Sequence, residues 1–296
     1  AEAHSNLGGT LIELGRLDES EASLRQAIAL KPDFAEAHNN LGNTLQELSR
    51  LDEAEASYRQ AIALKPDYAK AHNNLGNTLK ELGRLDESEA SLRQAITLKP
   101  DFAEAHYNLG NTLQEPGSLD EAEASYRQAI AMKPDYAEAH SNLGNTLKEL
   151  GRFDEAEASY GQAIALKPDY AEAHSNLGNT LKELGRLDEA EASYRQAIAL
   201  KPDYAEAHSN LGNALKELGR LDEAISSYVR AINLKPDFDN AYSNLGSALT
   251  GARFKKGDQN LYPILTNLLT QKNFVRPLDV AAAILSLLRL DNLIED

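Results

Sequence analysis

Apolar and polar positions recur along this chain with a period of 34 residues. Seven copies align without a gap from Ala1 to 238, and the stretch 171–204 reads AEAHSNLGNTLKELGRLDEAEASYRQAIALKPDY. An eighth copy begins at Asp239 and loses the pattern after Leu249. Seven gapless copies do not arise by chance, so we infer one small structural unit repeated along the chain.

Each copy predicts two helices separated by a turn. In 171–204 we expect a first helix over 171–184, because apolar residues recur there at helical spacing. Gly185 suits the position after a helix where φ is positive. The second helix should run to about Lys201, because Pro202 cannot continue it.

Both helix starts carry the spacing of a capping box. Asp169 stands three residues before Glu172, and Asp188 stands three residues before Glu191. In such a box the first residue accepts a hydrogen bond from the backbone, and the second reaches back to the cap. We therefore expect both helices to be capped by these side chains.

Two copies depart from the pattern. Pro116 replaces leucine at the end of the fourth first helix and should end that helix early. Gly161 replaces arginine inside a second helix, which should destabilise that helix by about 1 kcal/mol.

The small and apolar positions of each copy resemble the signature of the tetratricopeptide repeat (TPR) family. In 171–204 the matching residues are Leu177, Gly178, Ala190, Tyr194, Ala197 and Pro202. His174 and Leu181 stand where the family often has Trp and Tyr, and both keep bulk on the packing side. The resemblance implies an all-α, right-handed α-solenoid of helix–turn–helix repeats, with the first helices lining a concave groove.

The chain divides into three parts on this basis. Residues 1–238 form seven tandem repeats, 239–250 the first helix of a degenerate eighth, and 251–296 capping helices or a linker to a further domain. Two amphipathic helices are predicted over 259–271 and 277–290. We expect their apolar side chains to cover the last repeat: Leu265, Leu268, Leu269, Ile284, Leu285 and Leu288.

One face of every first helix is polar, and asparagine recurs on it. The first asparagine row comprises Asn6, Asn40, Asn74, Asn108, Asn142, Asn176, Asn210 and Asn244. The second row lies three residues later and comprises Asn43, Asn77, Asn111, Asn145, Asn179 and Asn213. Glu172, Ser175, Lys182 and Glu183 share this face in the sixth repeat. An amide carries donors and an acceptor, so it complements a peptide group.

These rows resemble the inner groove of the TPR superhelix in O-linked N-acetylglucosamine transferase-like proteins. That resemblance implies that the asparagines bind the backbone of an extended polypeptide. Two other readings stay open: recent duplication copies every residue, and asparagine can also hydrogen-bond the neighbouring helix.

Composition narrows the choice of partner. The formal net charge is −16, which argues against nucleic acid and anionic membranes and favours a neutral or basic polypeptide. Cysteine is absent, so thiolate chemistry is excluded. No signal peptide or membrane span is visible, and we expect a cytoplasmic protein.

Seven histidines recur at one position of the packing side: His4, His38, His72, His106, His140, His174 and His208. Successive members lie one repeat apart and so should not converge on a metal ion; we interpret them as packing residues. No phosphate-binding loop, nucleophile elbow or zinc-protease motif is present. We expect no catalysis, cofactor or metal within this segment.

Three functional hypotheses follow. The first is a protein–protein interaction scaffold that binds an extended peptide in its groove. The second is a substrate-docking arm of a larger glycosyl- or methyltransferase, because the sequence begins within the pattern as a piece of a longer chain would. The third is head-to-tail self-association through an uncapped first repeat, where Leu7 and Leu11 would be exposed.

Overall fold

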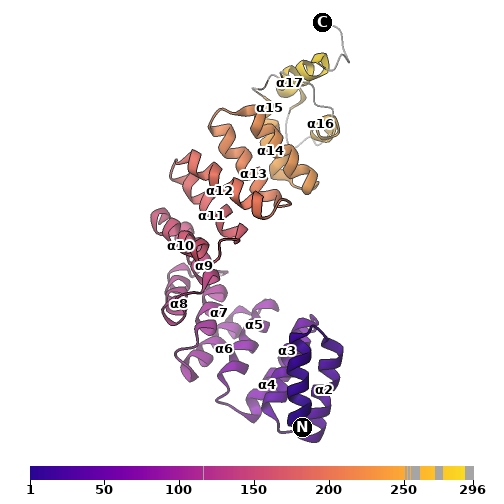
Figure 1. The fold of residues 1–296 in the computed structure, drawn as a ribbon, viewed down its shortest axis with the longest axis vertical. Coiled ribbons are helices and arrows are strands. Elements are labelled where there is room, and N and C mark those ends of the chain that lie inside the picture. The colour runs from indigo at the N-terminus through magenta and orange to yellow at the C-terminus, as the bar shows by residue number, and fades with distance from the viewer. Residues whose placement is uncertain (116, 251, 253, 255–260, 271–275, 291–296) are drawn as a thin grey trace. The chain divides into compact units, whose positions relative to one another are not determined.

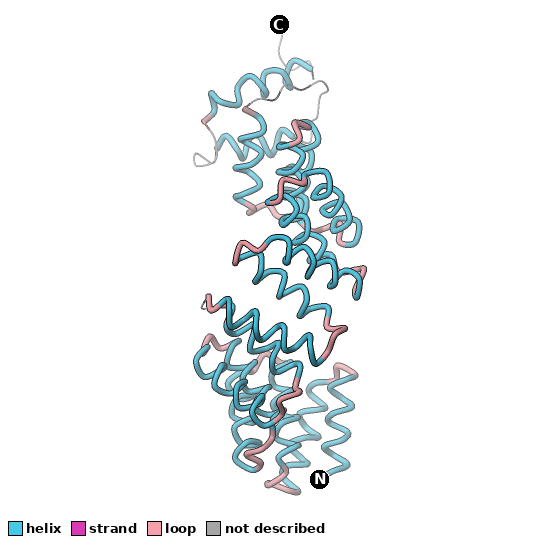
Figure 2. Tube along the Cα trace, turned by 90° about the vertical axis from the view of Figure 1, so that its left-hand side faces the viewer, coloured by secondary structure: helices cyan, strands magenta, loops and turns pink. Residues whose placement is uncertain are grey.

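Residues 1–115, 117–250, 252, 254, 261–270 and 276–290 are described by the computed structural model of this chain. Within those ranges every regular element is an α-helix, and the helices are joined by short loops (Figures 1 and 2). Consecutive helices pair with each other and stack on the next pair. The predicted all-α solenoid of helix pairs is therefore confirmed.

The first helices from α3 onward begin at the first position of their 34-residue copies, and α1 begins one position later. They are α1 (Glu2–Glu13), α3 (Ala35–Glu47), α5 (Ala69–Glu81), α7 (Ala103–Gln114), α9 (Ala137–Glu149), α11 (Ala171–Glu183), α13 (Ala205–Glu217) and α15 (Asp239–Leu249). The second helices are α2 (Leu17–Leu30), α4 (Leu51–Leu64), α6 (Leu85–Leu98), α8 (Leu119–Met132), α10 (Phe153–Leu166), α12 (Leu187–Leu200) and α14 (Leu221–Leu234). These bounds lie within a few residues of the predicted ones.

The chain separates into two compact units, Ala1–Leu150 and Gly151–Asp296. In the first unit each second helix from α2 to α8 packs against the first helix of its own repeat and against that of the next repeat. The second unit repeats this arrangement from α10 to α15. Within the described residues of each unit, the main contacts between repeats join neighbours, so the stability of each unit is close to a sum over repeats and their interfaces.

A glycine in each first helix allows the second helix to approach closely. An added Cβ at Gly42 would lie 2.5 Å from the ring of Tyr58, and one at Gly76 would lie 2.6 Å from Leu92. Tyr58 and Leu92 are both fully buried. The TPR signature therefore has a direct cause, because any side chain at the glycine would push the two helices apart.

The predicted capping boxes are wrong. Helix α11 starts at Ala171 and α12 at Leu187, and neither has a side-chain hydrogen bond at its N-cap. Asp188 lies in the first turn of α12, where a negative charge favours the helix dipole without capping it. Glu191 instead pairs with Arg195 and with Arg220 of the next repeat. The carboxylates serve interactions between helices, which local spacing could not indicate.

The helix ends follow the prediction more closely. Gly185 has a φ of 75°, as expected for a glycine after a helix. Helix α12 ends at Leu200, directly before Lys201 and Pro202. Pro116 lies outside the described residues, but α7 ends at Gln114, one position earlier than its equivalents, as predicted.

The two C-terminal helices are α16 (Leu261–Thr270) and α17 (Pro277–Leu290), close to the predicted ranges. Leu265 and Leu268 are buried in one apolar cluster with the last repeat, and Leu269 and Ile284 pack against it. The prediction for Leu285 is wrong, because this side chain is 47% exposed. Its place is taken by Leu287, which is fully buried. The face of α17 was misjudged, since helical spacing alone does not say which apolar arc meets a neighbour.

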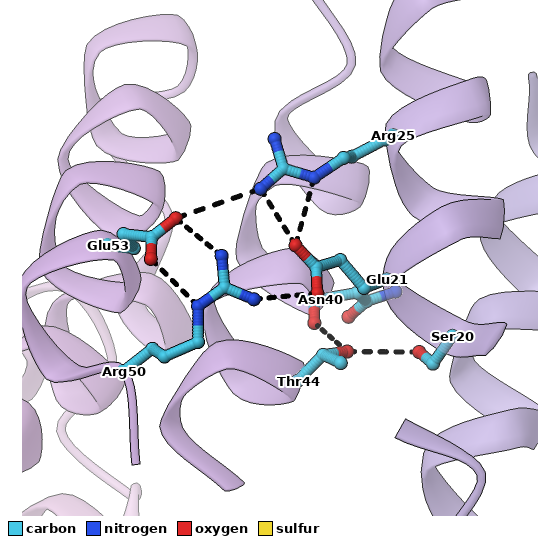
Figure 3. Close-up of polar contacts among 7 residues, drawn as sticks. All are labelled: Ser20, Glu21, Arg25, Asn40, Thr44, Arg50 and Glu53. Atoms are coloured by element: carbon cyan, nitrogen blue, oxygen red, sulfur yellow. Dashed lines mark hydrogen bonds and ion pairs between the residues drawn. The ribbon is translucent and has the colours of Figure 1, made fainter. Parts of the chain in front are cut away.

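Adjacent second helices are joined by charged side chains (Figure 3). Arg50 contacts Glu21 of the preceding repeat at 2.7 Å and Glu53 of its own at 2.6 Å, and Arg25 contacts the same two carboxylates at 2.8 and 3.7 Å. We call this set of four an Arg–Glu ring. Two further rings have equivalent pairs: Glu55, Arg59, Arg84 and Glu87; and Glu191, Arg195, Arg220 and Glu223.

Gly161 interrupts one ring of the second unit. It stands where an intact ring has Arg25 or Arg195, and Glu157, Arg186 and Glu189 keep the other three positions. The Glu157 side chain is 31% exposed, against 12% for Glu191 in an intact ring. Loss of one arginine therefore opens the ring to solvent.

No helix in the described part of the chain is both long enough and apolar enough to cross a membrane.

Candidate functional site

The first helices form a surface of their own in each unit. In the first unit α1 contacts α3, α5 contacts α7, and the intervening first helices also touch, in addition to their contacts with second helices. In the second unit α11, α13 and α15 are related in the same way. We call this surface, which carries both asparagine rows, the ladder face.

Members of the first asparagine row are only partly accessible on this face. Asn6 is exposed, and the other seven, from Asn40 to Asn244, are half-buried. All six members of the second row are half-buried as well. The predicted polar face needs one correction: Ser175 is buried, as is the residue before the first-row asparagine in five other repeats.

First-row side chains are tied to the preceding repeat. Asn74 donates from Nδ2 to the Oδ1 atoms of Asn39 at 3.1 Å and Asn43 at 2.9 Å. Asn108 donates to Asn73 at 3.0 Å. The alternative in which asparagine bonds the neighbouring helix therefore holds for these donors. Their Oδ1 atoms have weaker partners: that of Asn74 accepts only a 3.3 Å contact from Asn73 among the described residues.

Second-row side chains accept hydrogen bonds from the second helix of their own repeat. The Oδ1 atom of Asn43 accepts the hydroxyl hydrogen of Tyr58 at 2.8 Å. The same bond recurs at 2.8 Å for three more pairs: Tyr126 with Asn111, Tyr194 with Asn179 and Tyr228 with Asn213. No described residue accepts a hydrogen bond from Nδ2 of these four asparagines. Each tyrosine thus fixes an amide whose donors stay available.

The third repeat differs because Leu92 replaces the tyrosine. Asn77 there donates to Glu81 at 3.0 Å. The orientation of the second row therefore depends on the residue that the second helix supplies.

The two rows together present complementary halves of an amide. A first-row asparagine uses its donors between repeats and leaves oxygen lone pairs, whereas a second-row asparagine uses its oxygen and leaves its donors. A peptide unit has one N–H and one C=O to satisfy. Where a tyrosine holds the second-row asparagine, as Tyr58 holds Asn43, the ladder face can therefore offer both partners of a peptide group.

Charged groups surround the rows in a regular way. Glu36, Glu172 and Glu206 of the first helices pair with Lys65, Lys201 and Lys235, at 3.0 to 3.2 Å. Each of these lysines also lies over the aromatic ring three residues later, at 4.8 to 5.2 Å. For Glu172, burial opposes ionisation most strongly, but the hydrogen bond and charge of Lys201, a backbone hydrogen bond and the charge of Lys167 together hold the pKa of the carboxyl below its usual value.

One groove-facing residue that the sequence reading overlooked is Tyr107. It occupies the position of Ser175, and Asn142 donates to its hydroxyl at 3.1 Å and to Asn111 at 2.8 Å. Its half-buried ring lies 4.8 Å from that of Tyr136. The available signal was its size, because every equivalent position carries serine or asparagine.

The histidines lie away from the ladder face. His38, His72 and His106 line three separate cavities of about 450, 450 and 370 Å³, each between two consecutive second helices of the first unit. Each of the six from His38 to His208 is half-buried with Nε2 at 2.9 to 3.1 Å from a proline carbonyl. This agrees with a packing role. Within the residues described, no three His, Asp or Glu side chains cluster as metal ligands would.

Several solved structures share this fold. YrrB, described as a TPR protein with an unusual peptide-binding site, is 24% identical with a TM-score of 0.53, over 62% of this chain and 95% of YrrB. PilF of Pseudomonas aeruginosa is 22% identical with a TM-score of 0.63, over 70% of this chain and 94% of PilF. A chain of the Cut9–Hcn1 assembly of the APC/C is 17% identical with a TM-score of 0.69, over 82% of this chain and 48% of that one.

Family comparison agrees with the helix pairs seen in the structure. No curated protein sequence gives a significant match to the chain. The sequence profile of the TPR repeat, however, matches seven times, at 8–49, 45–83, 76–117, 115–151, 144–185, 178–219 and 212–250. Such repeats build scaffolds for contacts between proteins. The chain therefore belongs to the tetratricopeptide-repeat family.

Proposed function

We propose that this protein is an interaction scaffold that binds an extended polypeptide along its ladder face. The observation that carries the proposal is the division of roles between the two asparagine rows. Asn74 and Asn43 belong to adjacent repeats and are joined by a 2.9 Å hydrogen bond from Nδ2 of Asn74 to Oδ1 of Asn43, which leaves the oxygen of Asn74 and the amide nitrogen of Asn43 side by side. A peptide unit above this pair could give its N–H to one and its C=O to the other.

Anchoring of the side chains supports the same proposal. Tyr58 donates a hydrogen bond to Asn43, and Asn43 also accepts one from Asn74. These polar groups are therefore ordered before a ligand binds. Ordered groups lose less conformational entropy when they bind. Each hydrogen bond contributes only about 0.5–1.5 kcal/mol net, so useful affinity would require several repeats.

The character of the ligand follows from what the rows can recognise. Backbone groups are common to all sequences, so near-identical repeats should tolerate many peptides and shifts by whole repeats. The net charge of −16 favours neutral or basic segments. The peptide-binding site described for the TPR protein YrrB is consistent with this use of the fold.

A triple substitution tests the proposal. Asn108, Asn142 and Asn176 are changed to Ala together, and binding to a random array of 12-residue peptides is measured. We expect the affinity of bound peptides to fall at least about tenfold, because three hydrogen-bonding groups are lost.

The matched control changes Gln94, Gln128 and Gln162 to Ala, which are exposed residues on the second helices. This control should bind as the unaltered protein does. Circular dichroism checks that both triple variants remain folded. A folded asparagine variant with undiminished binding would rule out the ladder face as the site.

A further inference from the structure

Tyr107 is the single aromatic residue in a row of small polar ones. Its equivalents are Ser5, Asn39, Asn73, Ser141, Ser175, Ser209 and Ser243. Six of these, from Ser5 to Ser209, are buried between repeats. Tyr107 is too large for that space and remains half-buried. Part of its ring is therefore accessible on the ladder face.

The position of this ring is fixed from several sides. Its centroid lies 4.8 Å from that of Tyr136 and 6.0 Å from that of Tyr126, with interplanar angles of 37° and 55°. Its hydroxyl accepts a hydrogen bond from Asn142 at 3.1 Å. Tyr107 is thus held in place directly beside the first asparagine row, which Asn108 and Asn142 represent here.

Glu104 shares the face of Tyr107. The two residues lie three positions apart on α7, and Asn108 and Asn111 continue the same stripe at four and seven positions from Glu104. Side chains at this spacing are neighbours, with Cβ atoms about 5–6 Å apart. The carboxylate and the ring therefore border one patch.

Glu104 also lacks the lysine partner that Glu36, Glu172 and Glu206 have. Glu36, Glu172 and Glu206 are half-buried and paired with lysines, whereas Glu104 is exposed and forms no ion pair with any described residue. Lys133, the corresponding lysine, lies over the ring of Tyr136 at 4.5 Å. The fourth repeat therefore presents an unneutralised carboxylate beside an accessible aromatic ring.

We propose that Glu104 and Tyr107 form a subsite for one arginine side chain of the bound polypeptide, an inference that rests on the proposed function. A guanidinium is planar and permanently charged, so it can stack on the ring while it donates to the carboxylate. The other repeats offer no aromatic residue at this position. The subsite would therefore fix the register of a chain that identical asparagines hold without preference.

The test uses two fluorescein-labelled 12-residue peptides of alternating serine and alanine. One carries a single central arginine and the other citrulline, which keeps the shape of arginine but has no charge. Binding to the full chain is measured by fluorescence anisotropy at low salt. We expect the arginine peptide to bind about fivefold more tightly, because a cation–π contact and an ion pair are each weak at an exposed site.

Three variants assign the preference to the two residues. Y107S introduces the residue of most other repeats, and E104Q removes only the charge; because each keeps one of the two contacts, both should reduce the preference for the arginine peptide to about twofold. Y107F keeps the ring and should retain the preference. Thermal melting followed by circular dichroism checks that the fold is intact, and serine at five equivalent positions makes Y107S a tolerated change.

The outcomes separate the two proposals. If both peptides bind the unaltered protein equally well, the arginine subsite is refuted and the ladder face stands. If the preference is undiminished in folded Y107S and E104Q, arginine is recognised elsewhere and the subsite is likewise refuted. If neither peptide binds at all, the proposed function fails and the subsite fails with it.

Discussion

The hydroxyl of Tyr194 donates a 2.8 Å hydrogen bond to the side-chain oxygen of Asn179. Tyr194 belongs to a second helix and is fully buried, whereas Asn179 lies half-buried on the ladder face. Burial raises the pKa of this tyrosine, so it stays protonated and acts as a donor over the whole physiological range. A core residue thereby sets the orientation of a surface amide.

Tyr194→Phe should lower both stability and peptide binding. The ring still fills its space, but Asn179 loses its donor and its amide is free to rotate. We expect the free energy of unfolding to fall by about 1 kcal/mol, the usual net value of one hydrogen bond. Urea unfolding followed by circular dichroism measures the change. An unaltered unfolding midpoint would show that solvent replaces the tyrosine hydroxyl without loss.

Two glycine-to-alanine changes should alter the stability of the protein in opposite directions. A Cβ at Gly178 would lie 2.6 Å from Cε1 of Tyr194, so Gly178→Ala should destabilise the protein by about 1–3 kcal/mol through overpacking. A Cβ at Gly161 meets no atom within 4 Å, and Gly161→Ala should stabilise its helix by about 1 kcal/mol. Thermal unfolding of both variants provides the comparison. If both variants were stabilised, or both destabilised, the close approach of α11 and α12 would be contradicted.

Gly161→Arg should rebuild an interrupted Arg–Glu ring. The new guanidinium would lie four residues after Glu157 and next to Glu189, as Arg195 lies beside Glu191 and Glu223. We expect a higher melting temperature than for Gly161→Ala at low salt. The difference should disappear in 1 M salt, because screening weakens exposed ion pairs. A difference that persists at high salt would indicate packing of the arginine stem instead.

Acidification should lower the stability of the seventh repeat through the protonation of His208. Burial lowers the pKa of His208 below its ordinary value of 6.5, the carbonyl of Pro202 opposes this shift, and the charge of Arg230 adds to it. The unfolded chain therefore takes up this proton first, and stability falls as the pH drops below about 6.5 until the folded histidine also protonates.

His208→Gln removes this titration and serves as the comparison. Urea midpoints measured from pH 7.5 to pH 5 should fall more steeply for the unaltered protein than for the variant. Parallel slopes would mean that His208 titrates alike in the folded and unfolded chains.

Much of the fold could be predicted because the same pattern recurs in each 34-residue copy. Gly185 and Pro202 mark helix ends by conformational rules that act within a few residues, and the structure places both where expected. The capping boxes failed for a different reason. Asp188 and Glu191 have the correct spacing, but Glu191 is within reach of Arg220 in the next repeat, 29 residues away. A charged partner outweighs a local cap, and spacing along one helix does not show it.

Prediction of the candidate site was similarly divided. Helical periodicity places both asparagine rows on one face, and the rows indeed share the first helices. It could not show that Asn74 gives its donors to Asn39 and Asn43, because those contacts join different repeats. The role of Tyr107 could not be predicted for the same reason, because its contacts with Tyr136 and Asn142 join different helices.

The sequence by itself determined the repeating unit, the helix limits and the polar face of each first helix, since these depend on backbone preferences and on 3.6-residue periodicity. The tertiary structure alone decided which amide atoms remain available and which glutamate lacks a lysine. Such outcomes depend on distances between side chains of different helices, which the packing of Gly42 against Tyr58 and its equivalents fixes to within tenths of an ångström.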